Sequence, residues 1–256
     1  CIISVLLLIK LLIRKFKISS KMSYLIAIGT SVCGATAIVA TAPVINAKKT
    51  EVTYAIANIT LFGVFSMLVY PYFANLYFDG NSLYAGLFLG TAIHETSQVA
   101  AAGLIYDQQF NSPETLNIAT VTKLIRNTFL VVMIPLFGYL YNRGNKETTR
   151  VSIFRIFPYF VLGFIGMMFV RNIGDQVFQT NTEYNFENWN IFISYTKDTA
   201  KICLTMAMAA VGMSTNLAEL RSMGYKPFIV GFIAALVVGL VSIITMQSFE
   251  KITLLL

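Results

Sequence analysis

Long apolar runs separated by short polar segments dominate this sequence, and they constrain its fold more than any other feature. Hydrophobic residues make up 56% of the 256 residues and charged residues only 12%, against about 25% in a typical soluble domain. Such a chain lacks the polar surface to face water on all sides. Its length allows about seven spans of roughly 20 residues. Strand-like alternation of polarity does not occur, so the spans are expected to be helices.

We therefore predict an all-α, polytopic membrane protein that forms one membrane domain. Residues 1–13 are too few to cross a bilayer, so we expect the end of a span whose beginning, with further N-terminal spans, is missing. The predicted spans lie at about 1–13, 23–46, 52–78, 82–106, 116–142, 153–174, 194–218 and 227–248.

Basic residues concentrate in three predicted loops that lie an even number of spans apart, which places these loops on one side, predicted to be cytoplasmic. The net charge of +7 is assigned to these loops and not to nucleic-acid binding. The polar 175–190 stretch is then an external loop. The 71–81 loop should be cytoplasmic too, although it holds no basic residue. The clusters are Lys10, Arg14, Lys15, Lys17 and Lys21, then Arg143, Lys146, Arg150 and Arg155, and finally Arg221 and Lys226.

Two predicted spans contain glycines and small hydroxyl residues that weaken a helix. They are GTSVCGATA at 29–37, which runs on to Pro43, and AMAAVGMSTN at 207–216. One interpretation is tight helix–helix contact through small residues. The other is a pair of discontinuous helices whose freed amides and hydroxyls line a substrate site, at matching positions of two repeats. The substrate-binding candidates are Gly29, Thr30, Ser31, Gly34, Gly212, Ser214, Thr215, Asn216 and Arg126.

A third span, at 82–106, holds the only histidine, His94, next to Glu95. A zinc-protease motif would need a second histidine where Gln98 stands, so no metal site is expected. These groups form either a hydrogen-bonded polar core or a proton-titrating cluster.

Further charged residues lie at helical spacing in two other predicted spans. Lys123 and Arg126 either snorkel to the interface or clamp an anion. Asp198 and Lys201 either pair with each other or couple ions. The coupling candidates are His94, Glu95, Asp198 and Lys201.

Several segments, in order along the chain, resemble the YeiH-type sulfate exporter family. They are GTSVCGATAIVATAPVI, LFLGTAIHETSQVAAAG, VTKLIRN, IFPYFVLGF and AMAAVGMSTNLAELRSMGYKP, and together they cover about residues 23–235. The resemblance implies a bacterial inner-membrane transporter with a fold like those of bile-acid sodium symporters and cation/proton antiporters. Those folds contain inverted five-helix repeats and two crossing discontinuous helices. Here residues 1–80 would end the first repeat, 81–256 would form the second, and the crossing pair would be 23–46 and 194–218.

We expect an exporter of a small anion such as sulfate, sulfite or an organosulfonate, working by alternating access. A proton- or sodium-coupled cation antiporter is the alternative. A membrane enzyme or receptor is not expected, because no nucleophile–base set or metal-ligand cluster occurs, and the scattered Cys1, Cys33 and Cys203 form no disulfide framework. No cofactor is expected. The expected partners are the anion, the lipid bilayer and coupling protons, and a homodimer is left open.

Overall fold

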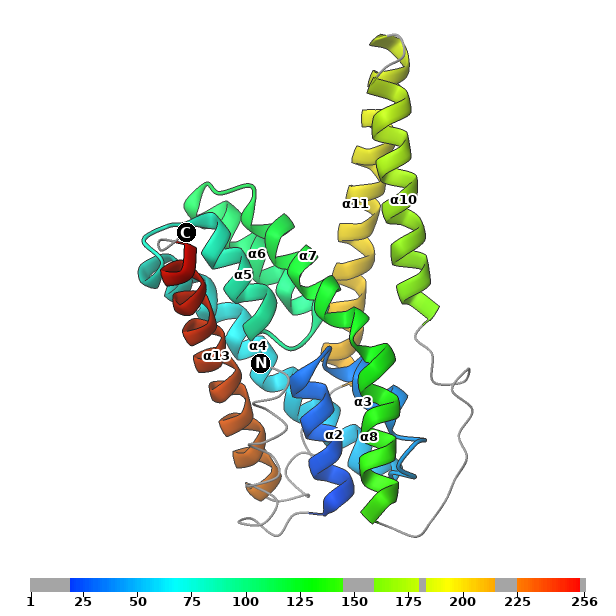
Figure 1. Cartoon of the computed structure of the whole chain (residues 1–256), viewed down its shortest axis with the longest axis vertical. Coiled ribbons are helices and arrows are strands. Elements are labelled where there is room, and N and C mark those ends of the chain that lie inside the picture. The colour runs from blue at the N-terminus through cyan, green and yellow to red at the C-terminus, as the bar shows by residue number, and fades with distance from the viewer. Residues whose placement is uncertain (1–18, 145–158, 180–182, 215–224, 254–256) are drawn as a thin grey trace. The chain divides into compact units, whose positions relative to one another are not determined.

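The structure is a computed structural model that describes residues 19–144, 159–179, 183–214 and 225–253 (Figure 1). Every regular element in these ranges is a helix, which confirms the all-α prediction for the described part of the chain. The chain divides into two compact units, one of residues 1–156 and 215–256 and the other of residues 157–214.

The first unit begins with a helical hairpin. Helix α2 (Ser20–Ser31), capped by Ser19, is separated from α3 (Ala35–Thr41) by residues 32–34. The start of α2 and the residues after α3, which are the two open ends of the hairpin, lie together. Ser19 Oγ donates to Glu51 Oε1 at 2.9 Å, and Lys21 Nζ donates to the Asn46 carbonyl at 2.7 Å. Ser19 and Lys21 start α2, whereas Asn46 and Glu51 follow α3. The chain therefore enters and returns on the same side.

A second hairpin repeats this design. Helix α5 (Ser82–Ala92) is followed by residues 93–95 and by α6 (Thr96–Phe110). Asn81 starts α5 by accepting hydrogen bonds from the Leu83 and Tyr84 amides, which satisfies two of its orphan donors. Ser112 Oγ donates to Ser82 Oγ at 2.7 Å, so the start of α5 lies beside the end of α6. The second hairpin also enters and returns on one side.

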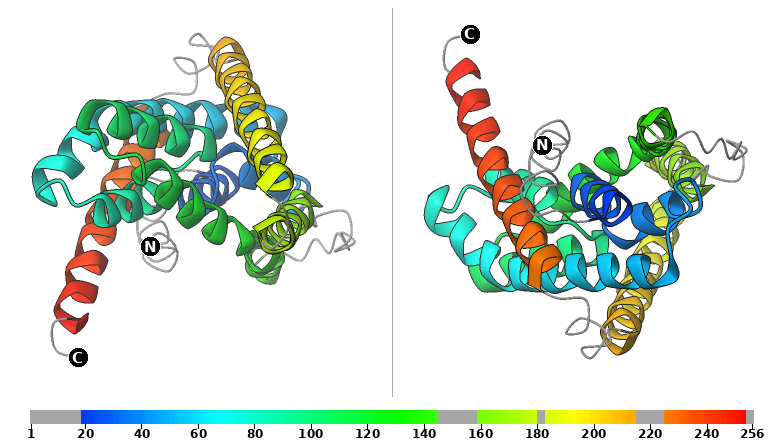
Figure 2. Two further views of the ribbon diagram at one scale, coloured as in Figure 1. Left: turned by 90° about the horizontal axis from the view of Figure 1, so that it is seen from above. Right: turned by 90° about the horizontal axis from the view of Figure 1, so that it is seen from below.

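Helix α4 (Lys49–Tyr77) connects the two hairpins. Its 29 residues correspond to about 44 Å of helix at 1.5 Å per residue, enough to cross a bilayer. Its Lys49 end lies at the open ends of the first hairpin, and its Tyr77 end precedes those of the second. Figure 2 shows α2 and α3 towards the blue end of α4 and α5 to α7 towards its cyan end. The hairpins therefore enter from opposite ends of α4.

Helix α13 (Tyr225–Thr253) runs alongside α4 in the same direction. Near its start, the Phe228 ring lies 4.8 Å from that of Phe62. Near its end, Gln247 Nε2 donates to the Tyr77 hydroxyl. The start of α13 therefore lies towards the Lys49 end of α4.

Helices α7 (Thr115–Thr128) and α8 (Leu130–Gly144) form a bent pair with an angle of 44°. Helix α7 packs closely on α5 and α6, where Gly86, Gly90 and Gly103 leave no room for a Cβ against α7. Helix α8 packs on the first hairpin, with the rings of Phe137 and Tyr24 5.9 Å apart. The pair thus runs from the Tyr77 end back to the Lys49 end.

These arrangements correct part of the predicted span list. Within the described residues, α4 and Phe228–Ser248 of α13 are long and apolar enough to cross a membrane, and the α7–α8 pair would be a third span. The segments 23–46 and 82–106, expected as single crossings, are hairpins. Hydropathy alone does not separate one long helix from two short antiparallel ones, because both need a similar number of apolar residues.

The same arrangement accounts for the 71–81 loop that lacks basic residues. Residues 75–81 lie at the Tyr77 end, whereas the described members of the basic clusters, Lys21, Arg143 and Lys226, lie at the Lys49 end and not on the same side as predicted. Residues 71–77 of this predicted loop, which begins at Pro71, lie inside α4. At the Lys49 end, residues 19–21, 46–51, 141–144 and 225–227 carry Lys21, Lys48, Lys49, Glu51, Arg143 and Lys226. At the Tyr77 end, residues 75–84, 106–116 and 248–253 carry Asp79, Asp107, Glu114, Glu250 and Lys251.

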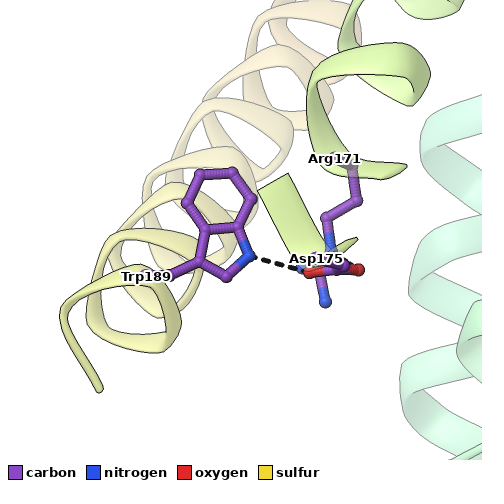
Figure 3. A network of polar contacts seen from close by, with 3 residues as sticks. All are labelled: Arg171, Asp175 and Trp189. Atoms are coloured by element: carbon purple, nitrogen blue, oxygen red, sulfur yellow. Dashed lines mark hydrogen bonds and ion pairs between the residues drawn. The ribbon is translucent and has the colours of Figure 1, made fainter. Parts of the chain in front are cut away.

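The second unit is formed by α10 (Tyr159–Gln179) and α11 (Glu183–Ser214). Asp175 ties the two helices together: it accepts from Arg171 Nε and from Trp189 Nε1, each at 2.7 Å (Figure 3). The Trp189 ring stacks on Phe178 and fits against Gly174, where a Cβ would clash with it. The 175–190 stretch, predicted as an open loop, is helical at 175–179 and 183–190, because these contacts support it.

The hairpin arrangement predicts which positions share a side of the membrane. Cysteines introduced at Ser20 and Lys48 should react with an impermeant maleimide from one side, and cysteines at Asn81 and Gln109 from the other. The measurement is labelling in right-side-out and inverted vesicles, in a cysteine-free background. Labelling of Ser20 and Lys48 from opposite sides would restore the single-crossing interpretation.

Candidate functional site where two helix breaks meet

The tips of the two hairpins meet at Lys123 of α7. Its ammonium donates to the Val32 carbonyl at 2.8 Å and to the Ile93 carbonyl at 2.9 Å, so it joins one break to the other. The side chain is 0% exposed. Lys123 therefore does not snorkel to an interface, as one interpretation of the sequence held. It lies in the interior of the first unit.

Arg126, one turn further along α7, binds the ends of the same two helices. Its Nε and Nη2 donate to the Ser31 and Thr30 carbonyls at 2.9 and 3.0 Å, and Nη1 donates to the Thr91 carbonyl at 2.6 Å. The last carbonyls of a helix have no partner within the helix, and they carry its partial negative charge. Lys123 and Arg126 together satisfy carbonyls at or just beyond the C-terminal ends of α2 and α5.

Glu95 makes the reverse connection, from the second break to the first. Its Oε2 accepts a hydrogen bond from the Ala35 amide at 2.8 Å. Gly34 beside it has φ 61° and lies so close to Oε2 that a Cβ would overlap this oxygen. Glycine is required at this position for two reasons: its positive φ, and the lack of space for a Cβ.

The charges at this meeting point do not balance. The partial charges of the helix ends cancel, because α2 and α5 contribute C-terminal ends while α3 and α6 contribute N-terminal ends. Lys123 and Arg126 then stand against Glu95. With all three ionised, the site has a surplus of positive charge in a buried environment, which favours an anion.

Other buried polar side chains surround the breaks. His94 is 1% exposed and lies by the Thr30 backbone, and its Nδ1 has no hydrogen-bond partner in the described part of the chain. Asn127 Nδ2 donates to Thr96 Oγ1 at 3.0 Å, where α6 begins. Gln98 Nε2 donates to the Thr60 carbonyl at 3.1 Å, in space provided by Gly63.

Two of these amides also leave an oxygen unpaired. Within the described residues, Asn127 Oδ1 and Gln98 Oε1 are buried without a partner. Buried polar atoms usually have one. These atoms are the groups that a ligand or a water molecule would satisfy.

The structure gathers one part of the predicted site and places the other part in the second unit. Gly29, Thr30 and Ser31 form the last turn of α2, and Gly34 lies in the first break, near Glu95. The remaining candidates are on or beyond α11: Asp198, Lys201, Gly212 and Ser214 lie within this helix, while Thr215 and Asn216 lie outside the described residues.

The sequence analysis missed two features of this site. The second break of the first unit falls at residues 93–95, inside the segment 82–106 that was predicted as one span with polar residues in an otherwise apolar helix. Lys123 was considered with Arg126 as an anion clamp, but its bridge between the two breaks was not predicted. The spacing of Lys123, Arg126 and Asn127 places three polar groups on one helix face, but it does not indicate that their partners are backbone carbonyls.

Comparison with known proteins places this chain in a family. A family model described as Conserved hypothetical protein 698 matches residues 1–231. The chain belongs to this family. No solved structure matches the chain.

Curated relatives of this chain are named UPF0324 membrane proteins. The one from Fusobacterium nucleatum is 35% identical over 237 residues, which cover 91% of this chain and 68% of the relative. Those from Clostridium tetani and Streptococcus agalactiae serotype V are 31% and 34% identical and cover 94% and 96% of this chain, and 69% and 70% of the relatives. These names agree with the apolar composition, so the chain is a membrane protein.

We predict that Lys123→Met lowers the stability of the folded protein against unfolding. The Val32 and Ile93 carbonyls would lose their partner, at a cost of about 1–3 kcal/mol for each group left buried and unpaired. The measurement is the unfolding midpoint in detergent. Lys226→Met, which removes an exposed lysine, is the matched control and should leave the midpoint unchanged. A Lys123→Met protein as stable as the wild type would contradict the bridging role.

Proposed function

We propose that this protein is a secondary transporter that exports a small anion by alternating access, with its substrate site where the two hairpin tips meet. The observation that carries the proposal is the contact of both breaks with Lys123, deep inside the first unit. Irregular backbone at membrane depth is tolerated where it is buried in protein or lines a cavity. Transporters use such half-helices to bind substrate and coupling ions near the midplane.

The order of elements also favours a transporter with inverted repeats. In the first half, a hairpin enters from the Lys49 end and α4 then crosses to the Tyr77 end. In the second half, a hairpin enters from the Tyr77 end and the α7–α8 pair returns. The proposed boundary between the repeats is the predicted one, between residues 80 and 81. The proposed repeats use hairpins where the related folds have discontinuous crossing helices.

With Lys123, Arg126 and Glu95 all ionised, the surplus of positive charge would favour an anion as substrate. Gly29, Thr30, Ser31 and Gly34 line the first break, and Arg126 provides electrostatic attraction. Lys201 and the 212–216 segment, in and beyond the second unit, stay predictions from the sequence. A sulfur oxyanion (sulfate, sulfite or an organosulfonate) is proposed from the resemblance to the YeiH-type exporters.

We further propose that His94 and Glu95 couple transport to protons, and that the protein resides in the bacterial inner membrane. The basic Lys49 end would face the cytoplasm, since basic loops are retained on that side. The acidic Tyr77 end would face outwards.

The proposal predicts anion flux. Proteoliposomes of the full-length protein, loaded with sulfite or sulfate, should release the anion faster than protein-free liposomes, and an imposed pH gradient should change the rate. The measurement is anion release over time, with chloride as the comparison anion. The absence of flux for every anion tested would contradict the proposed function.

A cation antiporter is the second candidate, favoured by the unpaired oxygens of Gln98 and Asn127 and by the Glu95 carboxylate, all of which suit a cation. Substitutions separate the two. If the protein exports anions, Glu95→Gln and Asp198→Asn should retain anion flux, while Arg126→Gln should lose it. If it exchanges cations, Glu95→Gln or Asp198→Asn should abolish exchange. Each variant is first checked for a monodisperse, folded protein.

A further inference from the structure

The carboxylate of Glu95 already occupies a small anion-binding position. The Ala35 amide donates to Oε2 at 2.8 Å, Gly34 leaves the space for this oxygen, and Lys123 lies close enough to attract the charge. The Glu95 side chain reaches this position from the other hairpin. We name these three groups, Gly34, Ala35 and Lys123, the carboxylate site.

The groups around the carboxylate site would suit a free oxyanion equally well. A carboxylate and a sulfur oxyanion both present oxygens to an N–H donor and to an ammonium. Lys123 has three donors, and its hydrogen bonds to the Val32 and Ile93 carbonyls use two of them. Lys123 can therefore donate to a ligand at this position while it still joins the two breaks.

We propose that Glu95 is a displaceable occupant of this position, so that a transported oxyanion and the Glu95 carboxylate compete for the Ala35 amide. This inference rests on the proposed function and identifies where that anion binds. In the state described here, Glu95 fills the position. In the anion-bound state, the oxyanion accepts from Ala35 and faces Lys123.

Competition of this kind couples the anion to a proton. If the anion displaced an ionised Glu95, the carboxylate would remain buried beside a second negative charge, which is costly. Protonation of Glu95 removes this cost: the carboxylate takes up one proton from water, and the neutral acid is a weaker acceptor than the anion. Each bound anion is therefore accompanied by one proton.

Other charged and titratable groups near the carboxylate site are Lys123, Arg126, Cys33 and His94. Lys123 and Arg126 remain bound to backbone carbonyls, and they favour an anion with or without Glu95. Cys33, in the first break, interacts with both Glu95 and Lys123. His94 lies near the two cations. Among these groups, only Glu95 occupies the Ala35 amide.

The test is anion binding as a function of pH in the purified full-length protein. Sulfite and sulfate are titrated by calorimetry between pH 5 and 8, with the result read for each ionic form of the anion. Binding to the wild type should strengthen as pH falls, by up to roughly tenfold per pH unit where one proton is taken up. Glu95→Gln and Glu95→Ala should bind at least as tightly as the wild type, with this dependence removed.

Asp107→Asn is the matched control. Asp107 also accepts a backbone amide, that of Leu116, but it lies at the open end of the second hairpin. This variant should keep the pH dependence of the wild type. Two Glu95 variants are used so that a failure of one to fold, judged by its unfolding midpoint, leaves the other to decide.

The outcomes separate this inference from the proposed function. Anion binding that depends on pH equally in the wild type and in both Glu95 variants would overturn the competition while leaving anion transport standing. Weaker binding in both variants would also overturn it, because Glu95 would then be a direct ligand. If neither sulfite nor sulfate binds to the wild type or to any variant, both proposals are overturned.

Discussion

The buried ends of four short helices are the constraint on which the first unit depends. Each break leaves backbone carbonyls and amides without helical partners in the interior, where an unpaired group is costly. Lys123 and Arg126 satisfy carbonyls of both breaks, and Glu95 satisfies the Ala35 amide. Without these side chains, continuous helices would be more stable than helices with two breaks, because they leave fewer buried backbone groups unpaired. The polar residues and the hairpins therefore require each other.

This dependence also limits how the protein can move. Lys123 and Arg126 lie on one helix and bind both hairpins, so separating the tips would expose several carbonyls at once. Helix α7 further packs on α5 and α6 through glycines that allow close contact. If the protein works by the proposed alternating access, the tips and α7 should therefore move as one body. Smaller changes, such as release of Glu95 from Ala35, can then occur within that body.

The sequence was sufficient to predict the helical class of the described residues. Glycine and small hydroxyl residues also marked 29–37 as a weak helical segment, and α2 and α3 are separated within it at residues 32–34, but the predicted pair of discontinuous crossing helices stays a prediction. It also indicated that His94 and Glu95 belong to a polar cluster within an apolar segment. It did not predict that 23–46 and 82–106 return on themselves. A hairpin and a crossing contain similar numbers of apolar residues, and contacts such as Ser112 to Ser82 depend on the tertiary fold. The partners of Lys123 and Arg126 are backbone carbonyls, which leave no trace in side-chain patterns.

Capping alone is an incomplete explanation of the buried cations. Helix ends can be capped by neutral side chains, by glycine or by water, each of which avoids the desolvation of a full charge. The first unit instead buries a lysine and an arginine beside one partly buried glutamate, and charged groups inside membrane proteins normally mark ion or substrate pathways. It also leaves acceptor atoms of Asn127 and Gln98 unpaired among the described residues. A meeting point of helix ends with only a structural role would not need both the buried cations and the unpaired acceptor atoms. A junction that binds and releases a charged ligand would, because its groups must serve the occupied and the empty state in turn.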